Sequence, residues 1–252
     1  MRDRAVISAC PRPGTAGLFY LITILAGRFA EVYVRGGLIV PRSAADTAAT
    51  IQVFESLYRQ GLAADLVMIA SYVIVTFLLY DLFKTVDRSL SLLAAFFSLI
   101  GLAVLAVNSL LHLAPVLFLN STPSPGGLEA AQWQDLALMC LRLHARGYTI
   151  SGVFFGMYCV LIGSLVFRSS FLPRALGVLM VAGGVGYLTD SFTSILAPGL
   201  AARLPGLPIL GGVAELLLSL WLMLMGVRSM KGWMEWIRRA LSERYWTTSR
   251  SM

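Results

Sequence analysis

The chain has 252 residues, of which 58% are hydrophobic and only 13% are charged, and its mean hydropathy is +0.77. A soluble globular domain carries about a quarter charged residues, so this composition excludes an ordinary soluble protein. The formal net charge of +7 lies mostly in the connecting segments and the C-terminal tail, and nucleic acid is not an expected partner.

The apolar residues form six blocks, which are separated by short polar segments that contain proline or glycine. Each block offers the roughly 20 residues that a helix needs to cross about 30 Å of hydrocarbon. We therefore predict an all-α, polytopic integral membrane helix bundle, with the whole chain as a single membrane domain. The six predicted transmembrane helices are residues 15–40, 61–83, 89–119, 148–167, 174–196 and 208–227.

A further helix is expected between the first two spans. Ser43 has the side chain of an N-cap residue, and Asp46 in the first turn suits the positive end of the helix dipole. This helix is predicted to run to Gln60 and to bend near Gly61, because a straight helix continued to Phe83 would exceed about 55 Å.

The segment before the fourth span is predicted to be a loop followed by a helix. Residues 121–127 contain two prolines and two glycines, which favours a loop. Residues 128–146 are too polar to span, so we expect an interfacial or protruding helix that leads into the fourth span. Within that span, Gly152 and Gly156 predict close helix packing, as does the glycine cluster at 183–186 in the fifth.

The basic residues indicate the orientation. Alternate connections and the two termini together carry thirteen Lys and Arg residues, whereas the other connections carry five. The positive-inside rule therefore predicts that both termini are cytoplasmic. Residues 231–246 combine aromatic and aliphatic residues at helical spacing with Lys231, Arg238, Arg239 and Arg244. This pattern predicts a cationic amphipathic helix that lies on the anionic lipids of the inner leaflet.

Polar side chains within the spans indicate where the protein acts. A charged group inside a membrane is costly, so it is a functional hypothesis by default. At about 1.5 Å per residue, most of these side chains fall in the outer half of the membrane, which predicts one polar pocket that opens outward. The pocket residues that we predict are Arg28, Glu31, Arg35, Asp65, Asn108, His112, His144, Tyr148, Asp190 and Glu215.

The charges and the spacing of these pocket residues limit the chemistry that they can carry out, but they do not select one function. Arg28, Glu31 and Arg35 are three and four residues apart, so they share a helix face and can pair. The four carboxylates and two arginines leave a formal charge of minus two. An uncompensated buried carboxylate is expensive, so protonation, a bound cation or a water-filled pocket are all open.

Six short motifs, taken in order, match a known family. They are AEVYVR at 30–35, AADL at 63–66, LHARGY at 143–148, FLPRALG at 171–177, GYLTDSF at 186–192 and AE at 214–215. From about residue 16 to 227, the chain resembles a bacterial membrane family catalogued as a domain of unknown function, family 4386. The resemblance implies a multi-pass protein of the bacterial cytoplasmic (inner) membrane. It implies no catalytic residues, ligand or cofactor.

Three functions remain open at this point. The first is binding or translocation of a small solute or a lipid head group. The second is an intramembrane metal-dependent hydrolase or lipid-modifying enzyme, because His112, His144 and Asp190, together with Asp65 and Glu215, are of the types that ligate zinc. A haem held by the two histidines is a further version of this second function. The third is a non-catalytic accessory subunit whose polar layer locks the helices together.

Overall fold

The computed structural model describes residues 12–120, 127–204 and 206–226, and helices make up almost all of these residues. The labelled elements are α2 (Arg12–Arg28), the π-helix η1 (Phe29–Arg35), α3 (Gly36–Leu38), α4 (Ala44–Val53), α5 (Glu55–Phe83), α6 (Arg88–Leu119), α7 (Ala130–Arg168), α8 (Arg174–Leu196) and α9 (Pro198–Ala201). A last helix, Leu207–Gly226, follows. Within these described ranges there is no strand.

Six helices are long and apolar enough to cross a membrane, as the sequence predicts. They are Pro13–Leu38, Glu55–Phe83, Arg88–Leu119, Ala130–Arg168, Arg174–Leu196 and Leu207–Gly226. Large apolar side chains such as Phe77, Phe96 and Val107 are exposed on the outside of the bundle, where lipid would cover them. The predicted cationic helix at 231–246 and both chain termini lie outside the described residues.

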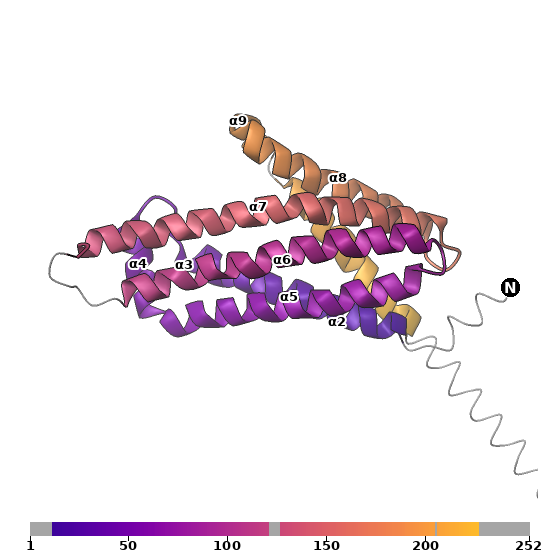
Figure 1. Cartoon of the computed structure of the whole chain (residues 1–252), viewed down its shortest axis with the longest axis horizontal. Coiled ribbons are helices and arrows are strands. Elements are labelled where there is room, and N and C mark those ends of the chain that lie inside the picture. Colours follow the sequence, from indigo (N-terminus) through magenta and orange to yellow (C-terminus); the bar gives the residue numbers. More distant parts are fainter. Residues whose placement is uncertain (1–11, 121–126, 205, 227–252) are drawn as a thin grey trace, which may run out of the picture.

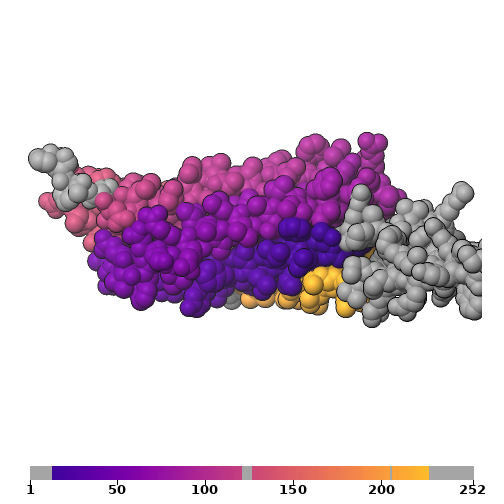
Figure 2. Space-filling model, turned by 90° about the horizontal axis from the view of Figure 1, so that it is seen from below, coloured from indigo at the N-terminus to yellow at the C-terminus, as the bar shows by residue number. Residues whose placement is uncertain are grey.

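The bundle is elongated, with most helices running along its length (Figure 1). One end, which we call the near end, holds the start of α2 and the end of Leu207–Gly226. The other end, which we call the far end, holds α3 and α4. In chain order, α5 packs against α6, α6 against α7 and α7 against α8, while α2 packs back against α5. The last helix lies alongside α2 (Figure 2), where Gly14 faces Gly226.

Three helices are longer than a membrane is thick. The 29 residues of α5, the 32 of α6 and the 39 of α7 correspond to about 43, 48 and 58 Å at the α-helical rise, against about 30 Å of hydrocarbon. The additional turns at the far end form a small second core with η1, α3 and α4. This core consists of Val34, Leu38, Ile51, Tyr58, Val116 and Leu141.

Local predictions before the second span are partly confirmed. The Ser43 hydroxyl accepts a hydrogen bond from the Asp46 backbone N–H at 3.1 Å, so Ser43 is the N-cap of α4. The bend is at Phe54 and not near Gly61. Gly61 stays helical because η1 packs directly on it: an added Cβ would lie 2.7 Å from a methyl group of Val34.

The helix predicted at 128–146 is present as the first half of α7, which runs without a break from Ala130 to Arg168, so it protrudes from the fourth span and is not a separate interfacial helix. Its start is fixed by a capping box, in which the Glu129 backbone N–H donates to the Gln132 side chain at 2.8 Å. The polar first half of α7 stays helical because it packs on α4 and α6. Close packing at the predicted glycines is confirmed, since a Cβ on Gly156 would lie 2.9 Å from the Gly184 carbonyl oxygen.

Candidate functional site

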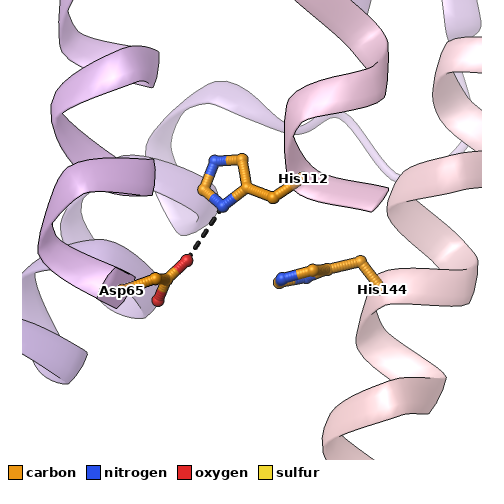
Figure 3. A group of neighbouring side chains, drawn as sticks. All are labelled: Asp65, His112 and His144. Atoms are coloured by element: carbon orange, nitrogen blue, oxygen red, sulfur yellow. Dashed lines mark hydrogen bonds and ion pairs between the residues drawn. The ribbon is translucent and has the colours of Figure 1, made fainter. Parts of the chain in front are cut away.

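Three buried side chains meet between the main core and the small far-end core. Asp65 of α5 is 1% exposed, His112 of α6 is 0% exposed and His144 of α7 is 3% exposed. The Nδ1 atom of His112 lies 2.9 Å from Oδ2 of Asp65. The His144 ring points toward this pair (Figure 3), and the three residues each offer one ligand atom within 4.8 Å of the others.

Two further side chains complete what we call the Asp65 group: Arg35 of η1 and Tyr148 of α7. The Arg35 guanidinium forms an ion pair with Asp65 Oδ2. The Tyr148 hydroxyl donates to Asp65 Oδ1 at 3.1 Å, and the Arg35 guanidinium lies over the Tyr148 ring, 5.4 Å from its centroid. Both carboxylate oxygens of Asp65 therefore accept hydrogen bonds from this group.

Glu31 is the second partner of Arg35, and it lies at the edge of the group. Its Oε2 atom accepts from Arg35 Nη2 at 2.6 Å and from Nε at 2.9 Å, which confirms the pairing predicted from their spacing. The Glu31 side chain is 58% exposed, so this pair is open to its surroundings, whereas the Arg35–Asp65 pair is enclosed.

Two irregular helix segments adjoin the group. Arg35 comes from the π-helical turns of η1, and His112 lies three residues before Pro115, which sits inside α6. Proline removes one backbone donor from a helix, and π-helical turns occur often at functional sites. Next to Pro115, the Tyr58 hydroxyl donates to the His112 carbonyl oxygen at 2.6 Å and fixes the backbone that carries this imidazole.

Asn108 supports the Asp65 group through the backbone of α7 and is not one of its members. Its side-chain amide donates to the His144 carbonyl oxygen at 2.9 Å, which ties α6 to α7 one turn from the imidazoles. This contact needs a glycine at position 147, because a Cβ there would lie 2.1 Å from the Asn108 side-chain oxygen. Asn108 thus positions His144.

The hydrogen bonds define the His112 tautomer. Arg35 Nη1 lies 3.1 Å from His112 Nδ1, but an arginine only donates and its contact with Asp65 satisfies it. We therefore assign the proton to Nδ1, which donates to Asp65, and this leaves Nε2 as an unprotonated acceptor. That Nε2 atom is buried without a hydrogen-bond partner among the described residues.

The structure does not bring the remaining predicted residues into the Asp65 group. Glu215 is half-buried and belongs to a second polar group, with the buried Tyr72 and Cys159. Asp190 is half-buried on α8, and within the described structure its carboxylate makes no hydrogen bond or ion pair. Arg28 is exposed and forms no ion pair with Glu31, because the π-helical turns of η1 shift the register that an α-helix would give.

Helix lengths explain why the two groups separate. Glu215 and Asp65 fall at similar depths only if all helices end at the same outer level. Asp65 is about 27 Å from the near end of α5, whereas Glu215 is about 17 Å from the near end of the last helix. Asp65 and Glu215, which the sequence predicts at the same depth, therefore lie at different depths in the bundle.

Two tyrosines of α5, Tyr58 and Tyr72, contact the residues of these two groups, and neither is among the residues predicted from the sequence. Tyr58, Asp65 and Tyr72 are seven residues apart on α5, so they lie along one helix face. Tyr58 contacts the His112 backbone, and Tyr72 contacts Glu215. A tyrosine seven residues before an intramembrane aspartate and another seven residues after it form the sequence pattern that identifies these two residues.

The fold and the Asp65 group together define the class: an all-helical, multi-pass membrane protein with a buried carboxylate–imidazole group. The chain belongs to the family described as Domain of unknown function (DUF4386), whose profile matches residues 15–226. Comparisons with curated proteins and with solved structures found no match.

Proposed function

We propose that this protein is a membrane-embedded metalloprotein, in which Asp65, His112 and His144 hold one divalent transition-metal ion for hydrolytic chemistry. The observation that carries the proposal is the His144 imidazole. It is buried, it has no hydrogen-bond partner among the described residues, and it points toward a histidine–carboxylate pair.

The donor set suits such an ion. Two imidazoles and one carboxylate are ligands that zinc uses, and three protein ligands leave one position open in catalytic zinc sites. Glu31, Arg35 and Asp65 carry a formal charge of minus one with neutral imidazoles, so a divalent cation is electrostatically favourable there. The ion would take the position of the proton that we assign between His112 Nδ1 and Asp65, and that proton would move to Nε2, so that the imidazole stays neutral as a ligand.

The surrounding residues fit hydrolysis. A bound ion of this kind supplies an activated water molecule and Lewis acidity at neutral pH. The Tyr148 hydroxyl and the Arg35 guanidinium are hydrogen-bond donors next to Asp65, where they can stabilise negative charge on a substrate oxygen. We infer that a substrate approaches from the side of Glu31, the exposed member of the neighbouring ion pair.

The position of the Asp65 group along the bundle favours a substrate at the membrane surface. At about 27 to 36 Å from the near end, the Asp65 group lies at the boundary of a hydrocarbon core of about 30 Å that starts there. The positive-inside rule assigns the more basic connections to the cytoplasm. Both termini are then cytoplasmic, and the Asp65 group faces the outer side of a bacterial cytoplasmic membrane. The cationic segment 231–246 would then contact anionic inner-leaflet lipids.

The other two functions have less support. Two shallow hollows do not favour solute or lipid binding at the Asp65 group, because no member of that group lines either of them. One is lined by Glu55, Ser56, Arg59, Gln60 and Ala63, and the other by Arg28, Phe29, Val32, Tyr33, Gly36 and Gly37. An accessory subunit with a structural lock is favoured by the enclosed Arg35–Asp65 pair. A lock of this kind needs no second imidazole, so His144 distinguishes the two proposals.

The test is the metal content of the full chain, purified in detergent without chelators and measured by elemental mass spectrometry. We expect about one zinc-class ion per chain in the wild type, and loss of that ion in His144→Ala. Asp190→Asn is the matched control, because it removes an intramembrane carboxylate outside the Asp65 group and should retain the ion.

Three outcomes would count against the proposal. A well-folded wild type that takes up no zinc, manganese or iron after dialysis against each ion would overturn it. Retention of the ion in a folded His144→Ala variant would exclude His144 as a ligand and favour the structural lock. Equal loss in both variants would indicate that the ion is bound adventitiously or elsewhere.

A further inference from the structure

A second polar group lies deeper in the bundle, where the half-buried Glu215 meets buried phenols and a thiol, and the proposed metal chemistry does not use it. Glu215 of the last helix accepts a hydrogen bond on Oε1 from the Tyr72 hydroxyl at 2.9 Å. The Cys159 thiol donates to the same oxygen at 3.6 Å. The Tyr20 and Tyr72 hydroxyls are 3.2 Å apart, so Tyr20 donates to Tyr72 as Tyr72 donates to Glu215. We call these four residues the Glu215 group.

Within the described part of the chain, no basic side chain compensates Glu215. The polar groups that face it are phenols and a thiol: Tyr20 from α2, Tyr72 from α5, Tyr158 and Cys159 from α7, and Tyr187 from α8. Arg28 lies one turn away, near Gly212, but it forms no ion pair with Glu215 among the described residues. A lone carboxylate at this depth would be an uncompensated charge in a low-dielectric region.

Aromatic rings fill the space around this carboxyl. The Tyr72 ring packs edge-on against Tyr20, Phe155 and Tyr158, with centroids 5.4, 5.1 and 6.0 Å away. The Tyr158 hydroxyl is buried without a hydrogen-bond partner in the described structure. One carboxylate and one thiol, without a histidine, do not make a metal site, and the packed rings favour the smallest cation over an organic ammonium ion.

We propose that Glu215 is a proton-binding site, which holds its proton at neutral pH between the hydrogen-bond donors Tyr72 and Cys159. On protonation, the proton bonds to a carboxylate oxygen and the side chain becomes neutral, while Tyr72 continues to donate to Oε1. On release, the proton passes directly from the half-buried carboxyl group to water, and the donors that already point at Oε1 stabilise the anion. This site is separate from the proposed metal site and does not depend on it.

Infrared spectroscopy of the purified full chain at neutral pH tests the proposal. A protonated carboxyl gives a C=O stretching band above the amide I band, which shifts when water is replaced by D2O. We expect this band in the wild type and its loss in Glu215→Gln. It should persist in Asp190→Asn and Asp65→Asn, so failure of the metal proposal would leave this result unchanged.

A chemical probe keeps the proposal testable if Glu215→Gln does not fold. Dicyclohexylcarbodiimide reacts with protonated carboxyls in apolar surroundings, and the modified peptide is identified by mass spectrometry. We expect labelling of Glu215 in the wild type that decreases as the pH is raised. Absence of both the infrared band and the label in a folded wild type would overturn the proposal, as would a band that survives in Glu215→Gln.

Discussion

Arg35 has two carboxylate partners in opposite surroundings, and the difference decides what each pair contributes. Asp65 is buried with it, whereas the Glu31 side chain is 58% exposed. An exposed ion pair contributes little because water and salt screen it. An enclosed charge that loses its partner is strongly destabilising, whatever the net contribution of the intact pair.

Substitution of the two carboxylates should therefore have unequal effects on stability. We expect Asp65→Asn to lower the free energy of unfolding by about 3 to 5 kcal/mol, because it leaves the buried Arg35 charge with only its exposed partner. Glu31→Gln should cost less than about 1 kcal/mol. Thermal unfolding of both variants in the same detergent measures the difference. Equal losses would mean that the two carboxylates share the compensation of Arg35.

Residue-level prediction from the sequence succeeds where partners share one helix. The spacing of Glu31 and Arg35 predicts their ion pair, and Ser43 is predicted as a cap. The partner of a residue on another helix depends on helix rotation and height, which local spacing does not contain. This is why His112 meets Asp65 and not Asp190, although both carboxylates are candidates in the sequence.

At the scale of helices, hydropathy predicts which segments are long and apolar enough to span. The fifth span is predicted at the observed bounds, Arg174–Leu196. The first half of α7 is missed as part of its span, because packing on α4 and α6 stabilises it outside the apolar block. The π-helical turns of η1 are not predicted from the sequence, and they place Val34 directly on Gly61 of another helix, a contact that the composition of neither segment shows.

The contact between α7 and α8 should be sensitive to a single methyl group. We expect Gly156→Ala to lower stability by about 1 to 3 kcal/mol, because its Cβ would overpack the α7–α8 contact. The Gly184 carbonyl oxygen, 2.9 Å from that Cβ, belongs to helix backbone and cannot move aside. Gly37→Ala is the matched control, since no atom lies within 4 Å of a Cβ there. Thermal unfolding of the pair measures the effect, and a neutral Gly156→Ala would show that the two helices can separate without cost.

For the whole molecule, the sequence predicts one polar layer and the structure has two polar groups at different depths. Helix α5 connects them, because Asp65 and Tyr72 lie on one face and belong to the Asp65 and Glu215 groups respectively. The heights of the helices relative to one another separate the groups, and those heights follow from the far-end core. No pattern within a single span encodes that core, so the sequence cannot predict the separation.

The orientation of the bundle decides which side of the membrane the Asp65 group faces, and two single-cysteine variants test it. In a background with Cys10, Cys140 and Cys159 replaced by alanine, Ala131→Cys places a thiol at the exposed start of α7, and Thr85→Cys places one at the exposed near-end turn. With cytoplasmic termini, a membrane-impermeant maleimide should label position 131 in intact host cells. It should label position 85 only after permeabilisation. The reverse pattern would place the termini outside, so that the Asp65 group faces the cytoplasm and its substrate comes from within the cell.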